Sequence, residues 1–156
     1  METTTYSGYS FVKFFQNDFA DVCFNNELRM AVCSARQEYI PISSFKEIFN
    51  EVSSRLNTHE VRYFLFDKRN LRTFHQPSME WYFAVWKPVV KNKGLHGHYK
   101  ILPQLDWFVK SVEAGKHEIF QKYGSDILRD ISVKYVDSVE QAIEDVQRLK
   151  SQTQDQ

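Results

Sequence analysis

Apolar residues in the first quarter of the chain alternate with polar ones and predict a β-hairpin. The alternation breaks at Asn25–Asn26, two residues that tolerate positive backbone φ and are typical of a two-residue hairpin loop. With that loop, Cys23 is expected to face Leu28. Cys33 is expected to face Asp18, so the two thiols should lie several rungs apart and form no disulfide. The apolar positions of the hairpin are Phe19, Val22, Phe24, Leu28, Met30 and Val32.

Four later segments place apolar residues at the spacing of an amphipathic helix. The first opens at a capping box, Ser44–Glu47, and its apolar face ends before Asn57. Gly115 is expected to weaken the third helix, and Gly124 to stop it. The expected helices cover residues 44–57, 77–90, 106–123 and, from 137 or 138, the stretch to 149, while the apolar face of the first consists of Phe45, Ile48, Phe49, Val52 and Leu56.

Three more strands are expected between these helices. Residues 61–66 are almost continuously apolar, as a central strand covered on both faces should be, and Asp67 ends the run. Shorter strands are expected at 99–102 and 132–136. Strands that alternate with helices predict an α/β domain with a mixed sheet of four to five strands, in which an antiparallel hairpin precedes parallel crossovers. The domain should span residues 11–150, with flexible ends at 1–10 and 151–156.

Composition narrows the class of protein. The 156 residues include 42% hydrophobic side chains, which excludes a disordered chain. Twenty Lys and Arg balance twenty Asp and Glu, so a generic nucleic-acid binder is not expected. Two cysteines exclude a disulfide scaffold and a four-cysteine zinc site. Neither a secretory signal nor a membrane span is recognisable, so the expected location is cytoplasmic.

Several short motifs occur in a characteristic order. The central strand runs into "FDKRNL", which contains Asp67 and Arg69; "EWYFAVW" lies on the next helix, a later strand ends in Leu-Pro, and "DSVEQAIEDV" opens the last helix. From about residue 18 to 150 the chain resembles the STAS/SpoIIAA-like proteins, particularly uncharacterised bacterial members of Bacteroidetes type. The resemblance implies a four- to five-stranded mixed sheet covered by helices, and a regulatory or binding role without a cofactor.

The resemblance also implies a phosphorylation site. Some members of the wider family are anti-sigma-factor antagonists that are phosphorylated on a serine at the start of the helix after the central strand. In this chain the matching positions hold His75 and Gln76, and the nearest serine is Ser78. Backbone N–H groups in the first helical turn would stabilise a phosphate on Ser78. The alternative is that Ser78 is simply a favourable residue for a helix start.

Charged residues gather after the central strand. Asp67, Arg69, Arg72 and His75 follow its carboxyl end, where open α/β sheets commonly bind ligands. Together with Ser78 they could hold a charged small molecule or a phosphopeptide through guanidinium and imidazole groups. The alternative, which is the commoner arrangement, is a surface ion pair beside a polar loop.

The second helix is broader in its apolar face than a sheet-packed helix requires. Trp81 and Val85 fall beyond the edge of its core stripe, which indicates a pocket, a subunit interface or further interior packing. Lys87 falls on the remaining solvent-facing arc. The expected core stripe consists of Met79, Tyr82, Phe83, Trp86, Val89 and Val90.

Further candidates give weaker signals. The basic residues between the second helix and the next strand are expected to form a solvated loop. His96 and His98 supply two potential metal ligands without a third, so no metal site is predicted. No serine-nucleophile elbow is present, and both cysteines fall inside expected strands. The basic residues are Lys87, Lys91, Lys93, His96, His98 and Lys100.

These observations lead to three hypotheses. The first is a non-catalytic regulatory module that binds a protein partner or forms a homodimer through Trp81, Val85 and the loop from Asp67 to Ser78. The second is a binder of a small or lipid-like molecule, held in an apolar cavity between the helices and the sheet and rimmed by Arg69 and Arg72. The third is an enzyme of unrecognised type. No cofactor is expected, and the identity of partner or ligand, the pathway and the oligomeric state stay open.

Overall fold

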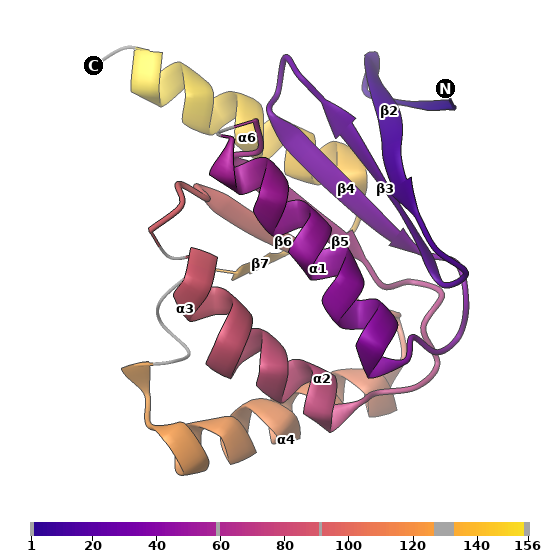
Figure 1. Ribbon diagram of the computed structural model, residues 1–156, viewed down its shortest axis with the longest axis vertical. Coiled ribbons are helices and arrows are strands. Elements are labelled where there is room, and N and C mark those ends of the chain that lie inside the picture. The colour runs from indigo at the N-terminus through magenta and orange to yellow at the C-terminus, as the bar shows by residue number, and fades with distance from the viewer. Residues whose placement is uncertain (1, 59, 91, 127–132, 155–156) are drawn as a thin grey trace.

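A mixed sheet runs through the protein with its strands in sequence order (Figure 1). The computed structural model describes residues 2–58, 60–90, 92–126 and 133–154. Strands β1 to β4 pair antiparallel, and β4 to β7 pair parallel. The strands are β1 (Thr3–Tyr6), β2 (Tyr9–Gln16), β3 (Ala20–Asn25), β4 (Met30–Ala35), β5 (Tyr63–Asp67), β6 (Gly97–Ile101) and β7 (Val133–Tyr135).

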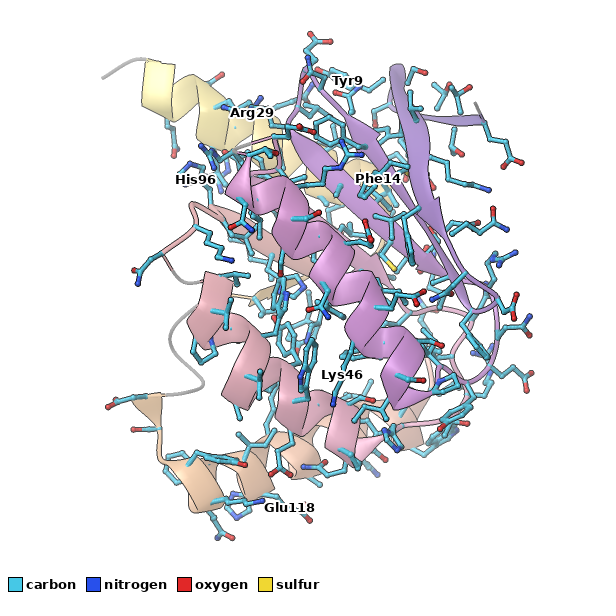
Figure 2. All side chains as sticks on the ribbon, viewed as in Figure 1. Tyr9, Phe14, Arg29, Lys46, His96 and Glu118 are labelled. Atoms are coloured by element: carbon cyan, nitrogen blue, oxygen red, sulfur yellow. The ribbon has the colours of Figure 1, made fainter. Side chains whose placement is uncertain are left out.

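Helices cover both faces of this sheet. On one face lie α1, the continuous segment α2–η1–α3, and α4, while α6 lies on the other face (Figure 1). In Figure 2 side chains fill the space between α1 and the segment α2–η1–α3. The helices are α1 (Ile42–Asn57), α2 (Gln76–Trp81), the π-helix η1 (Tyr82–Trp86), α3 (Lys87–Val90), α4 (Asp106–Tyr123) and α6 (Val139–Gln154).

The central strand β5 joins two hydrophobic cores. Phe64 and Phe66 point toward α1 and η1, whereas Tyr63 and Leu65 point toward α6. All four are buried, which confirms the prediction of a strand covered on both faces. Aromatic rings dominate the first core, where Phe49 of α1 contacts several of them.

The α/β class is confirmed, but the sheet has seven strands in the described part of the chain, so the expected four to five is too low. The additional strands β1 and β2 lie in a region expected to be partly a loose terminus. Ser7 and Gly8, both at positive φ, form the tight turn between them, a geometry suited to the right-handed twist of a hairpin. At the other end α6 continues through Gln154, beyond the expected boundary at 150.

The hairpin of β3 and β4 exists but has a different register. Its loop comprises residues 26–29, because Asn25 pairs with Met30 and its side chain accepts a 2.7 Å hydrogen bond from the Leu28 amide. Cys33 therefore lies opposite Val22, one rung from Cys23. The two thiols are free and belong to opposite faces of the sheet. The sequence placed them several rungs apart, which is wrong.

The helix boundaries agree closely with the amphipathic patterns. All five predicted apolar positions of α1 are buried, and the helix ends at Asn57 as expected. It starts earlier than expected, at Ile42 after Pro41, so that Ser44 lies inside the first turn and does not cap it. Gly115 lies within an unbroken α4. In the described ranges no helix combines the length and apolar character needed to cross a membrane.

Candidate functional site

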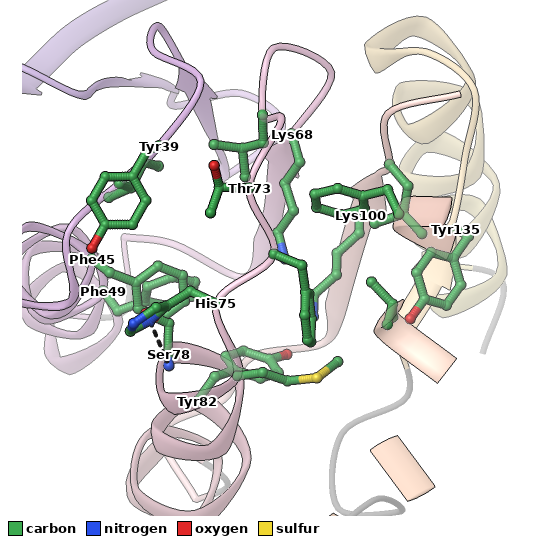
Figure 3. Close-up of a pocket in the computed structure, with 17 residues that line it drawn as sticks. Tyr39, Phe45, Phe49, Lys68, Thr73, His75, Ser78, Tyr82, Lys100 and Tyr135 are labelled. Atoms are coloured by element: carbon green, nitrogen blue, oxygen red, sulfur yellow. Dashed lines mark hydrogen bonds between the residues drawn. The ribbon is translucent and has the colours of Figure 1, made fainter. Parts of the chain in front are cut away.

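A largely apolar cavity lies between the sheet and the helices of the first core (Figure 3). It encloses about 690 Å³ of space, part of it open to solvent, of which the centre of a water molecule can reach about 60 Å³. The walls come from α1, α2, η1, α4 and the loop that follows β5. Its apolar lining includes Ile40, Phe49, Leu71, Met79, Phe108 and Val112.

Two lysines reach into this cavity, which we call the lysine cavity (Figure 3). Lys100 of β6 is only 4% exposed, and its Nζ lies 4.2 Å from the centroid of the Tyr82 ring. Lys68 follows β5, with its Nζ 5.2 Å from the centroid of the Phe66 ring. The two amines thus lie over aromatic rings inside an apolar space.

Strand register explains why these lysines converge. Phe66 of β5 pairs with Lys100 of β6, and side chains two residues apart on a strand share a face. Lys68 therefore lies on the same face as Phe66 and Lys100. The Lys68 amide donates a 2.9 Å hydrogen bond to the Ile101 carbonyl. The backbone pairing with β6 therefore continues one residue beyond the end of β5. The parallel pairing of β5 and β6 therefore places the amines of Lys68 and Lys100 in the same cavity.

The amines of the lysine cavity have no acidic partner among the residues that the structure describes. Among the described residues no carboxylate lines the cavity, and no ion pair involves Lys68 or Lys100. Burial lowers the pKa of the Lys100 amine well below its usual value, and neighbouring positive charges act in the same direction. Burial, followed by the charge of Lys116, lowers the pKa of Lys68 to about 8. Both shifts reflect the free energy lost when an ammonium group leaves water without an acidic partner.

Tyr82 and His98 form a hydrogen-bonded pair next to Lys100. The Tyr82 hydroxyl is hydrogen-bonded to Nδ1 of His98, which shares a face of β6 with Lys100. The His98 ring is fully buried, and within the described residues its Nε2 has no hydrogen-bond partner. Burial lowers the pKa of this imidazole well below its usual value, and the nearby lysine charges add to the effect. Burial thus favours the neutral form of the His98 ring.

A second, more open hollow adjoins the lysine cavity at the carboxyl ends of β6 and β7. It encloses about 880 Å³, of which the centre of a water molecule can reach about 340 Å³. Leu102, Val112 and Tyr135 line both spaces and so form the wall between them. The Tyr135 hydroxyl is hydrogen-bonded to Lys116, whose Nζ lies 4.5 Å from the centroid of the same ring.

The predicted charged cluster is only partly brought together. Asp67 and Arg69 form a two-pronged ion pair, with Nε–Oδ1 and Nη2–Oδ2 distances of 3.0 and 2.7 Å. Nη1 of Arg72 donates to the carbonyls of Arg69 and Leu71. Arg69 lines the open hollow and Arg72 a separate surface depression, and neither lines the lysine cavity.

His75 and Ser78 do line the lysine cavity, but they also serve the start of α2 (Figure 3). Nδ1 of His75 accepts a hydrogen bond from the Ser78 amide at 3.3 Å and lies 2.9 Å from the Ser78 hydroxyl oxygen. Ser78 is only 6% exposed. In this conformation its hydroxyl is engaged and enclosed; phosphorylation of Ser78 stays a prediction.

The π-helix η1 changes which side chains of the second predicted helix are buried. Trp81 is half-buried against Phe45, with ring centroids 6.0 Å apart, and Val85 is 47% exposed. Val89, expected in the core, is 51% exposed, while Lys87, expected in solvent, is fully buried. One extra residue in a helical turn rotates the following positions by about 100°, which a 3.6-residue pattern does not anticipate.

The expected solvated basic loop is also wrong in part. Lys87, His98 and Lys100 are buried, and Lys100 lines the lysine cavity. Sequence reasoning missed their burial because a run of basic residues usually lies in solvent; Lys100 was placed in the strand expected at 99–102, which begins earlier than expected, at Gly97. The alternation of His98 and Lys100 with Tyr99 and Ile101 was the available signal for a strand with one polar face.

Neither metal ligands nor known relatives add to this description. In the part of the chain that the structure describes, no group of three or more His, Cys, Asp or Glu side chains could hold a metal ion. Comparison with known proteins found no matching family model, curated protein or solved structure. The STAS/SpoIIAA-like assignment therefore stays a prediction.

Proposed function

We propose that the protein binds a small amphipathic anion in the lysine cavity. The observation that carries this proposal is the pair of amines, Lys68 and Lys100, in an apolar space that no carboxylate lines among the described residues. Ligand pockets characteristically combine apolar walls with a few convergent polar groups. The proposal is a specific form of the second hypothesis from the sequence, with lysines in place of arginines as the charged groups.

Charge complementarity favours an anion over a neutral ligand. An anionic oxygen would accept hydrogen bonds from the two amines, for which the described residues supply no acidic partner, and charge-assisted bonds of this kind are roughly twice as strong as neutral ones. Its charge would also raise the pKa of Lys68 and Lys100 toward their usual values. Binding would therefore be accompanied by proton uptake.

The dimensions of the cavity favour a short molecule. The space open to the centre of a water molecule is about 60 Å³, and the wall residues are mainly aromatic and aliphatic. A carboxylate or phosphate on a short hydrocarbon or a single ring fits this description. A long acyl chain would have to displace the wall of Leu102, Val112 and Tyr135 and extend into the open hollow.

A matched probe series tests the proposal. Hexanoate, hexanol and hexylamine share one hydrocarbon body and differ in charge, so titration calorimetry with each separates the charge from the apolar contribution. Only hexanoate should bind measurably. Lys68→Met and Lys100→Met should each weaken hexanoate binding at least tenfold, as expected for the loss of one charge-assisted hydrogen bond. Lys110→Met removes an exposed lysine outside the cavity and should bind like the wild type. Equal binding of hexanol and hexanoate, or no binding of either, contradicts the proposal.

A protein-interaction role is the second candidate, and one observation favours it. Val85 and Val89 lie four residues apart on the η1–α3 segment and are both about half exposed. Exposed apolar side chains on one helix surface are typical anchors of interfaces. Light scattering over a range of concentrations tests for a homodimer. If this surface is used, Val85→Glu should shift a concentration-dependent dimer to monomer; a wild type that is monomeric throughout contradicts the homodimer form of the hypothesis.

A further inference from the structure

Lys100 is surrounded in the way that a nucleophilic amine requires. We propose that Lys100 condenses with the carbonyl group of a small aldehyde acid or keto acid and holds it as an imine, while Lys68 pairs with the anionic group of the same molecule. This inference rests on the proposed function, because it needs an anion in the lysine cavity. It adds a covalent bond and names the chemical class of the ligand.

The surroundings of Lys100 keep its amine free of acidic partners. Titratable groups from several elements surround it. The Tyr82 ring of η1 lies under its Nζ, His98 lies two residues earlier on the same face of β6, and Lys68 follows β5. Lys87 of α3 and Lys116 of α4 contribute further positive charge. Tyr135 of β7 lines the same cavity. None of these groups is a carboxylate, so no acidic group among them stabilises the ammonium form.

A neutral amine is the reactive form in imine chemistry. Desolvation in an apolar pocket and a neighbouring cation are the two known ways in which proteins activate a lysine as a nucleophile. Lys100 has both, and burial together with these charges lowers its pKa well below the usual value. Surface lysines stay protonated near pH 7 and react slowly.

The two lysines differ in a way that assigns their roles. Lys100 is 4% exposed, and its Nζ lies over the rings of Tyr82 and Phe83, 4.2 and 5.5 Å from their centroids. Lys68 is only partly buried, and its pKa of about 8 leaves it mostly charged at neutral pH. Lys68 is thus suited to hold a carboxylate or phosphate, and Lys100 to attack a carbonyl carbon.

The step balances without an oxidant or reductant. The nitrogen lone pair of Lys100 adds to the carbonyl carbon, and one proton moves from nitrogen to the carbonyl oxygen to give a carbinolamine. The C–O bond of the carbinolamine then breaks, its hydroxyl group leaves with the second N–H proton as one water molecule, and a C=N bond forms. Tyr82 lines the cavity, and its hydroxyl is hydrogen-bonded to His98, so this pair can carry a proton during loss of water. An imine in the cavity is shielded from bulk water by the apolar walls.

Reductive trapping tests this inference on the intact protein. Purified protein is incubated at pH 7 with glyoxylate, which carries an aldehyde beside a carboxylate, and sodium cyanoborohydride is added to reduce any imine to a stable amine. Intact-mass analysis should show one adduct per chain, and peptide mapping should place it on Lys100. Lys100→Met should abolish this adduct, Lys68→Met should slow its formation at least tenfold, and Lys110→Met should leave it unchanged. Propanal, which lacks the carboxylate, should lose the preference for Lys100.

The outcomes separate this inference from the proposed function. Peptide mapping of the wild type gives an answer even if a variant folds poorly. Adducts spread over exposed lysines such as Lys110 at rates similar to Lys100 overturn the inference, as does the absence of any adduct. If hexanoate still binds in a Lys68- and Lys100-dependent manner, the proposed function stands while the imine chemistry fails. If hexanoate does not bind either, both fail.

Discussion

Lys100 and Tyr82 form a cation–π contact in the core, with the amine nitrogen 4.2 Å from the centre of the ring. In the charged form of Lys100 such a contact contributes about 2 kcal/mol when it is desolvated. It does not replace the several hydrogen bonds that an ammonium group makes with water, and within the described residues no acidic group compensates for them. Lys100 is therefore a residue that the fold accommodates at the expense of stability, which is common at functional sites.

Replacing this amine should stabilise the protein. Lys100→Met keeps a similar length while removing the buried polar group, so we expect the free energy of unfolding to rise by about 1–3 kcal/mol. Denaturant unfolding followed by circular dichroism measures this change. Lys110→Met, at an exposed position, should change the free energy by less than about 0.5 kcal/mol. A clear loss of stability in Lys100→Met would instead identify Lys100 as a structural residue.

The lowered pKa of Lys68 predicts how stability depends on pH. The value is about 8 in the folded protein and 10.5 in the unfolded chain, so between these values the unfolded chain binds more protons. Stability therefore contains a contribution that rises with pH from about 8 upward, and below that range the buried charge is destabilising. Lys68→Met should be more stable than the wild type at pH 7, and its advantage should shrink as the pH rises from 8 to 10. A difference that stays constant over this range contradicts the prediction.

The two strands that build the lysine cavity show what the sequence could and could not predict. Strand β5 is apolar on both faces, so its position in the sequence and its place inside the sheet could be predicted from the continuous apolar segment alone. In β6 the polar residues His98 and Lys100 are as deeply buried as Tyr99 and Ile101. Burial of His98 and Lys100 depends on helices that come from distant parts of the sequence, and no local pattern reports it.

Helix geometry sets a second limit. The apolar spacing located the segment from residue 76 to 90 correctly. The π-turn inside it, however, buries Lys87, which was expected in solvent, and exposes Val89, which was expected in the core.

The first hairpin, β1–β2, was missed for another reason: Ser7–Gly8 is a recognisable turn, yet its flanking strands have few buried side chains. The predicted charged residues do follow β5, but Arg69 pairs with Asp67 and Arg72 donates to backbone carbonyls, local contacts that the sequence pattern does not reveal.

Close packing of α4 on α2 predicts the effect of a single methyl group at Gly115. A Cβ atom there would lie 2.8 Å from Cζ of Phe74 and 2.5 Å from Oε1 of Gln76, and the Phe74 ring is itself packed against Phe108. Overpacking costs about 1–3 kcal/mol, which exceeds the helix-propensity gain of about 1 kcal/mol. Gly115→Ala should therefore lower the free energy of unfolding. Glu118→Ala on the outer side of the same helix (Figure 2) should be nearly neutral. Stabilisation by Gly115→Ala would mean that the two helices are not held this closely.

The contacts of Asp145 on α6 should make the core between α6 and the sheet sensitive to acid. Burial alone would raise the pKa of this carboxyl group, but hydrogen bonds from Lys134, Tyr99 and Arg148 outweigh it and lower the pKa to about 2. Because the folded pKa lies below the usual 3.8, the associated stability is present above about pH 4 and is lost as the pH falls toward 2.

Asp145→Asn tests this reading of α6. Tyr99 donates to Asp145 at 2.6 Å and joins the helix to β6, so the variant should lose about 1.5–3 kcal/mol at pH 7, the usual contribution of hydrogen bonds to a charged group. It should also lose less stability than the wild type when the pH is lowered from 4 to 2, as measured by thermal unfolding at each pH. Glu144→Gln removes an exposed carboxylate from the same helix and serves as the control for net charge. If both variants follow the same pH profile, the acid response comes from overall charge rather than from the contacts of Asp145.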